Sequence, residues 1–83
     1  MKIRVTEIDS KSIRSLEWVG LPDEGFGYGT LTVEFQTGRV YDYFNVPFTE
    51  INYLTTADSL GEYFNEIFKP VFGKRYKEVT PIF

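Results

Sequence analysis

Tyrosines and basic residues are the side chains of this sequence whose types and spacing suit ligand binding. Tyr41 and Tyr43 alternate along one segment, and Arg39 precedes the first of them by two residues. Tyrosine rings on a sheet can stack on nucleic-acid bases, and a neighbouring arginine can meet a phosphate. The same rings can instead pack across strands, with their hydroxyl groups at a polar rim. The choice depends on the face of the sheet that the tyrosines occupy.

A second group of basic and aromatic residues lies in the last fifteen residues of the chain. Four of the nine Lys and Arg residues gather here, interleaved with aromatic rings. Such a mixture is typical either of a solvated basic segment or of a site for a single strand or a phosphorylated small ligand. The residues are Lys69, Phe72, Lys74, Arg75, Tyr76 and Lys77.

Asn65 is a further candidate, because an inward-facing amide beside the tyrosine hydroxyls would offer both a donor and an acceptor to a base edge. The alternative is an exposed polar position or a helix-terminal cap. Asp58, Glu62 and Glu66 follow one another at intervals of four residues. On a helix they form a solvated acidic face, which is favoured over acid-base chemistry.

The composition excludes several classes of site. The 83 residues include neither Cys nor His, so thiolate chemistry, the commonest metal ligand and the commonest general base are absent. We expect no enzyme, no cofactor and no metal site. A net charge of −3 argues against general affinity for duplex DNA. No apolar run approaches the length of a membrane helix, so we expect one cytoplasmic domain, residues 1–83, without a membrane partner.

Leu21 to Gly29 is a loop rich in glycine and acid, and its GFGYG stretch superficially resembles phosphate-binding loops. It lacks the Lys-Ser/Thr pair of a P-loop, and a strand rather than a helix follows it. A mobile loop that closes over a ligand fits better, as does a contact with a protein partner or a second copy through Phe26 and Tyr28.

Three strands and two helices are expected to position these residues. Ile13 to Gly20 alternates imperfectly and is predicted as the first strand, and Thr30 to Phe35 alternates strictly. A turn at residues 36–38 leads into a third strand, RVYDYF. The segment after Tyr76 allows a final short strand.

The register of the hairpin decides where the tyrosines point. A two-residue turn sets Val33 opposite Asp42 and places an unpaired carboxylate on the apolar face, which is costly. A three-residue turn with Gly38 at positive φ sets Val33 opposite Tyr41 instead. The second register is favoured.

This register places Tyr41 and Tyr43 on the side of the core, with Leu31 opposite Tyr43. Val40, Asp42 and Phe44 then point to the other face.

Two helices follow the hairpin. Pro47 suits the first position of a short helix through Leu54. A second helix begins near Ser59, which forms a capping-box pair with Glu62, and is predicted to end at Lys69-Pro70. Its apolar face comprises Leu60, Tyr63, Phe64, Ile67 and Phe68. The fold class is therefore α+β, with a small antiparallel sheet of about three to four strands packed against two short helices.

An ordered set of motifs carries a family resemblance over about residues 9 to 77. The motifs are Ser12-Ile13, Leu31-Thr32-Val33-Glu34-Phe35, Gly38, Tyr41-Asp42-Tyr43, Val46-Pro47, Ser59-Leu60-Gly61-Glu62-Tyr63-Phe64-Asn65 and Tyr76. In this order the chain resembles the KTSC domain, named for the C-terminus of some lysyl-tRNA synthetases and also found as a small stand-alone bacterial or phage protein. The resemblance implies no established activity, although RNA binding is suggested by the company the domain keeps. The enlarged loop PDEGFGYG departs from the family pattern.

The expected function is a non-catalytic binding module for RNA or a nucleotide-like small molecule. Its candidate ligand-binding residues are Arg39, Tyr41, Tyr43, Asn65, Lys69, Lys74, Arg75 and Tyr76. The alternative is a protein-interaction module, such as a phage-encoded inhibitor or an accessory subunit, that uses the enlarged loop of residues 21–29.

Overall fold

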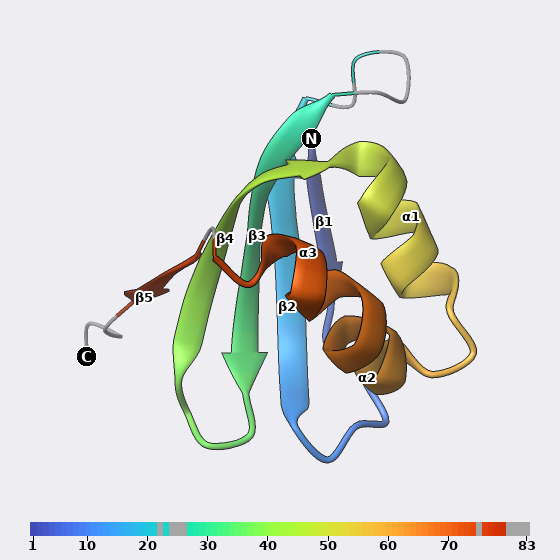
Figure 1. Cartoon of the computed structure of the whole chain (residues 1–83), viewed down its shortest axis with the longest axis vertical. Coiled ribbons are helices and arrows are strands. Elements are labelled where there is room, and N and C mark those ends of the chain that lie inside the picture. The colour runs from blue at the N-terminus through green and yellow to red at the C-terminus, as the bar shows by residue number, and fades with distance from the viewer. Residues whose placement is uncertain (22, 24–26, 75, 80–83) are drawn as a thin grey trace.

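Five antiparallel strands form one sheet in the computed structural model, which describes residues 1–21, 23, 27–74 and 76–79. The strands lie in the order β1-β2-β3-β4-β5 (Figure 1). They are β1 (Lys2–Val5), β2 (Ile13–Gly20), β3 (Tyr28–Phe35), β4 (Val40–Pro47) and β5 (Tyr76–Val79). Each strand therefore pairs with its neighbours in sequence, and the helices lie in the connection between β4 and β5.

The sheet is larger than the three to four strands predicted. The strand at Ile13–Gly20 is confirmed but is the second, and β5 forms in the segment that allowed a final strand. The strand missed is β1, which pairs with residues 16–19 of β2. Its Ile3 and Val5 pack against the core, while the Lys2 amine lies 3.0 Å from Glu17. Four residues that alternate between charged and apolar give too short a pattern to be recognised as an edge strand.

The β3–β4 hairpin has the register predicted from the sequence. Val33 pairs with Tyr41, and Leu31 pairs with Tyr43. Gly38 has a φ of 91°, and its N–H donates to the Phe35 carbonyl at 2.9 Å. The turn therefore requires the left-handed backbone that glycine adopts readily.

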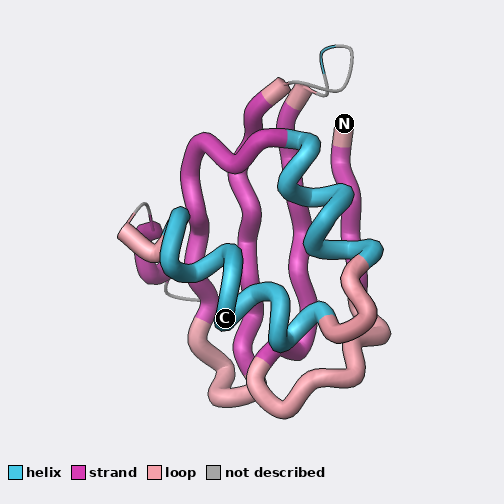
Figure 2. Tube along the Cα trace, turned by 45° about the vertical axis from the view of Figure 1, so that its right-hand side comes forward, coloured by secondary structure: helices cyan, strands magenta, loops and turns pink. Residues whose placement is uncertain are grey.

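Two helical segments cover one face of the sheet and leave the other open (Figure 2). The first is α1 (Phe48–Thr56), which begins one residue later than predicted, because Pro47 has an extended backbone and ends β4. The second runs from residue 60 to residue 72 as α2 (Leu60–Tyr63), a π-helical turn η2 (Phe64–Phe68) and α3 (Lys69–Phe72). Ser59 caps its start by accepting a hydrogen bond from the Glu62 N–H at 3.3 Å.

The prediction that this helix ends at Lys69-Pro70 is wrong. The Lys69 N–H bonds to the Phe64 carbonyl, five residues earlier, so the backbone widens by one residue before the proline. Pro70 then lies in the first turn of α3, where a missing N–H costs little. The π-helical turn thus lets the segment continue to Phe72.

The same turn changes which residues face the sheet. Phe64, Phe68 and Phe72 stack in a row, with ring centroids 5.1 and 4.7 Å apart. A regular α-helix would rotate residues spaced by four progressively around its axis, and the wider turn offsets that drift. Ile67, predicted on the apolar face, is instead 51% exposed.

One hydrophobic core fills the space between the sheet and the helices. Trp18 lies within it, and its Nε1–H donates to the Val46 carbonyl at 3.0 Å. Gly29 leaves room for this ring, since a Cβ there would lie 2.7 Å from Trp18 Cε2. The buried residues are Ile13, Leu16, Trp18, Leu31, Val33, Tyr43, Val46, Ile51, Leu54, Phe64, Phe68 and Phe72.

A polar contact joins the two helical segments at the edge of this core. The Tyr63 hydroxyl donates to Glu50 Oε1 at 2.8 Å. Desolvation, together with this hydrogen bond, raises the pKa of Tyr63 to about 12. None of the helices in the described segments combines the length and the apolar character that crossing a bilayer requires.

Candidate functional site

The tyrosines of β4 lie on the face of the sheet that the helices cover. Tyr43 is only 1% exposed, and its ring contacts Phe64 and Phe68 edge-on. Burial raises its pKa to about 12. Tyr43, a candidate ligand residue from the sequence, is therefore a core residue, because the helices leave its ring no free surface for stacking. Tyr41, two residues before Tyr43 on the same strand, is half-buried.

The open face of the sheet carries short polar side chains instead of an aromatic platform at its centre. The Thr32 hydroxyl donates to Asp42, and the Ser15 hydroxyl donates to Glu34 at 3.2 Å. Asp42 therefore points away from the helices, as the favoured register requires. A base-stacking platform of β4 tyrosines on this face is excluded.

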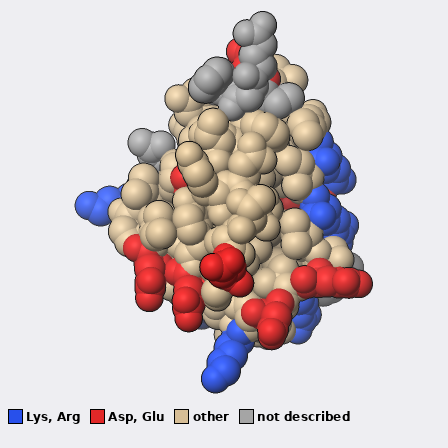
Figure 3. Space-filling model, turned by 90° about the vertical axis from the view of Figure 1, so that its right-hand side faces the viewer, with Lys and Arg blue, Asp and Glu red and all other residues tan. Residues whose placement is uncertain are grey.

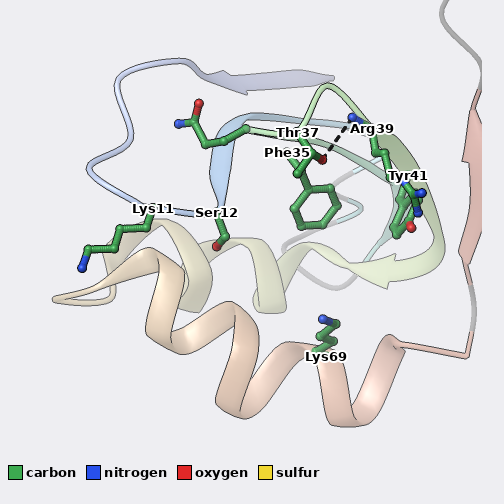
Figure 4. A pocket seen from close by; sticks show the side chains of 8 residues that line it. Lys11, Ser12, Phe35, Thr37, Arg39, Tyr41 and Lys69 are labelled. Carbon is green, nitrogen blue, oxygen red and sulfur yellow. Dashed lines mark hydrogen bonds between the residues drawn. The ribbon is translucent and has the colours of Figure 1, made fainter.

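A cavity of about 340 Å³ lies where the β3–β4 turn, the residues before β2 and the helix meet. Figure 4 shows Arg39 beside Tyr41 and the Lys69 amine pointing from the helix toward the Phe35 ring, with Lys11 at the opposite side. We call it the basic cavity. Its lining residues are Lys11, Ser12, Phe35, Gln36, Thr37, Arg39, Tyr41 and Lys69.

Three cations and no carboxylate line this cavity among the described residues. Lys11 and Lys69 form no ion pair within the described segments. Arg39 is partly balanced, because its Nε lies 3.8 Å from Glu78 Oε1 on β5. The Tyr41 hydroxyl and Glu78 both raise the pKa of Arg39, so its charge is permanent. In a chain of net charge −3, the basic cavity is therefore a local concentration of positive charge.

Aromatic rings form the inner wall of the basic cavity. The rings of Phe35 and Tyr41 meet edge-on at 5.3 Å, and Phe35 contacts Phe64 of the core at 5.9 Å. Tyr76 of β5 stacks on Tyr41 at 4.9 Å. The wall is therefore fixed by packing from both sides, which prepares a rigid apolar surface beside the cations.

A second cavity of about 430 Å³ adjoins the first, and Lys11 and Ser12 line both. We call it the polar cavity. Asn65 is exposed and lines this cavity rather than the basic cavity. The alternative of an exposed polar position therefore holds, and an inward-facing amide beside the tyrosine hydroxyls does not. The remaining lining residues are Asp9, Ser10, Ser59, Gly61 and Glu62.

The three acids predicted on one helix face are exposed as expected, although Asp58 lies before Ser59, the cap of the helix, and not on the helix itself. Asp58, Glu62 and Glu66 are all exposed. Acidic side chains gather over the lower part of the molecular face shown in Figure 3, with basic ones at its margins. Among the described residues, no group of three or more Asp or Glu side chains is arranged to hold a metal ion.

The basic segment of residues 69–77 is divided by the fold. Of its described basic residues, only Lys69 lines the basic cavity, and Lys74 is exposed outside it. Lys77 pairs with Asp42 in the β4–β5 register and shares the open face with it. Arg75 lies outside the described residues, as does Phe26 of the enlarged loop. Tyr28 is 64% exposed.

Five lining residues were not among the candidate ligand-binding residues expected from the sequence. They are Lys11, Ser12, Phe35, Gln36 and Thr37. In the sequence pattern, Phe35 is one more apolar position of an alternating strand, and Lys11 is a single charged residue in a loop. Their proximity arises from the sheet, since Ile13 at the start of β2 pairs with Phe35 at the end of β3. No local pattern marks them as ligand-binding residues.

Known proteins resemble this chain over most of its length. A model of the KTSC domain family matches residues 26–72. An uncharacterized protein of Stutzerimonas stutzeri is 41% identical over 63 residues, which cover 76% of this chain and 80% of that protein.

Two lysine–tRNA ligases match a shorter stretch. The ligase of Trichormus variabilis is 43% identical and that of Nostoc sp. is 41% identical, each over 51 residues. The match covers 61% of this chain but only 9% of each ligase. No solved structure matches the chain significantly.

Proposed function

This chain belongs to the KTSC domain family, and we propose that it is a non-catalytic binding module whose basic cavity recognises RNA or a nucleotide-like small molecule. The observation that carries the proposal is the meeting of three cations with an aromatic wall and no lining carboxylate. Phosphate is bound by Lys and Arg, and bases pack on aromatic rings.

Size and chemistry agree with this ligand class. A cavity of about 340 Å³ lies at the lower end of the range of small-molecule sites, which favours one nucleotide unit over a larger cofactor. The Ser12 and Thr37 hydroxyls add neutral hydrogen-bonding groups between the cations. The lining includes no pair of nucleophile and base, which supports binding rather than catalysis. The name of the lysine–tRNA ligase relatives, which includes an RNA, is consistent with the proposal.

Direct binding tests the proposal. Fluorescence anisotropy with labelled single-stranded RNA, and competition by a panel of nucleotides, should show binding at low salt. Lys69→Met and Arg39→Met should each weaken it severalfold. Lys74→Met, an exposed lysine outside the cavity, is the matched control and should bind as the unchanged protein does. The proposal fails if neither RNA nor any nucleotide binds, or if the cavity variants bind as well as the control.

A protein-interaction function is the second candidate, and exposed apolar residues favour it. Val19, Tyr28 and Phe44 are 52%, 64% and 40% exposed and share the open face near the enlarged loop. Such side chains suit a contact with a protein partner or a second copy. Shortening residues 21–29 to a tight turn should then abolish association, measured by light scattering or partner capture, while the circular dichroism spectrum stays unchanged. Persistent association would refute this role for the loop.

A further inference from the structure

The polar cavity differs chemically from the basic cavity beside it. Two carboxylates, Asp9 and Glu62, lie among its lining residues, together with the Asn65 amide. None of these three side chains forms a hydrogen bond or ion pair with another described residue. They are therefore available to a ligand, and the carboxylates accept hydrogen bonds but repel a phosphate.

Lys11 stands at the junction of the two cavities. Both Lys11 and the next residue, Ser12, are lining residues of the two cavities. The Ser10 hydroxyl fixes this stretch of backbone by accepting hydrogen bonds from the Ser12 and Ile13 N–H groups at 3.2 and 3.1 Å. A ligand that occupies both cavities must therefore pass Lys11, which is the natural position for a linking phosphate.

We propose that the ligand is a single strand of RNA at least two nucleotides long. One base packs against the aromatic wall of the basic cavity, the linking phosphate lies near Lys11, and the ribose of the next nucleotide enters the polar cavity. The ribose hydroxyls donate to Glu62 and Asp9, since carboxylates are favoured acceptors for the 2′-hydroxyl. This inference rests on the proposed function and narrows it from nucleotides in general to RNA.

The arrangement favours RNA over the simpler ligands. A free mononucleotide fills only one cavity and leaves the other solvated. DNA lacks the 2′-hydroxyl, so the carboxylates of the polar cavity lose a donor while still repelling the phosphates. The polar cavity therefore discriminates RNA from DNA, and the basic cavity binds phosphate.

Calorimetric titration with AMP, the ribodinucleotide ApA and its deoxy analogue d(ApA) tests the inference. We expect ApA to bind about tenfold more tightly than d(ApA), the effect of one hydrogen bond to a charged group. We also expect ApA to bind more tightly than AMP, because AMP fills only one of the two cavities. Glu62→Ala should reduce the preference for ApA over d(ApA) toward one. Glu66→Ala removes an exposed acid of the same helix outside both cavities, and it should keep the preference.

The outcomes separate the inference from the function on which it rests. Equal binding of AMP and ApA, or of ApA and d(ApA), overturns the inference and leaves nucleotide binding intact. A ribose preference that survives Glu62→Ala overturns the role of the polar cavity. If none of the three ligands binds and longer RNA does not bind either, the proposed function itself is overturned, and the inference with it.

Discussion

Replacing Lys69 with Met removes one of the three cations of the basic cavity while keeping an unbranched apolar stem. For single-stranded nucleic acid, the logarithm of the binding constant falls by about 0.7 per logarithmic unit of salt for each phosphate contact. Three contacts therefore give a slope of about −2.1, and two give about −1.4. A tenfold rise in salt should weaken RNA binding about 100-fold in the unchanged protein and about 25-fold in Lys69→Met.

Fluorescence anisotropy with labelled single-stranded RNA, from about 20 to about 200 mM salt, measures both slopes. Lys74→Met carries the same change of charge outside the cavity and should keep the original slope. Glu78→Gln should strengthen binding, because Glu78 lies 3.8 Å from Arg39 and opposes a phosphate there. The reasoning is refuted if Lys69→Met keeps the original slope, or if Lys74→Met loses as much of it.

Three further predictions concern stability. Because burial raises the pKa of Tyr43 to about 12 while an unfolded tyrosine ionises near 10, stability should be full below about pH 10 and fall as the pH rises toward 12. Urea unfolding at about pH 8 and pH 11 should show less of this loss in Tyr43→Phe, and an equal loss would contradict it. Phe68→Ala should cost about 3–5 kcal/mol in urea unfolding, since the ring is fully buried between Phe64 and Phe72, and a cost below about 1 kcal/mol would argue against that packing. Gly38→Ala should cost about 1 kcal/mol in thermal unfolding, because a Cβ meets nothing within 4 Å and only the backbone at φ 91° is strained; an unchanged midpoint would contradict this.

Local chemistry explains why much of the fold was predictable. The free-energy cost of burying the Asp42 carboxylate selects one hairpin register. In that register Tyr41 and Tyr43 face the core. Likewise Pro47 and Ser59 mark the starts of both helical segments. These signals act within a few residues of the features they determine. An edge strand of four residues, and a proline accommodated by a wider helical turn, have no comparable signal.

The candidate site was only partly predictable, because its residues come from separate parts of the chain. Arg39, Tyr41 and Lys69 were expected and do line one cavity. Lys11 joins them only through the pairing of β2 with β3, and its sequence neighbours give no hint of it. The register showed which way Tyr43 points, but the depth of its burial depends on the helix that covers it. Tertiary packing therefore decides which candidates remain accessible.

The sequential order of the strands also has a consequence for the time course of folding. Strands β1 to β4 are adjacent along the chain, so three hairpins can close over short loops at a small entropic cost. The return to β5 spans both helical segments and must close a longer loop. Lys69 lies in that returning part, whereas Arg39 and Tyr41 belong to the early hairpin. We therefore expect Lys69 to join the basic cavity late in folding, after the hairpin that carries Arg39 and Tyr41 has formed.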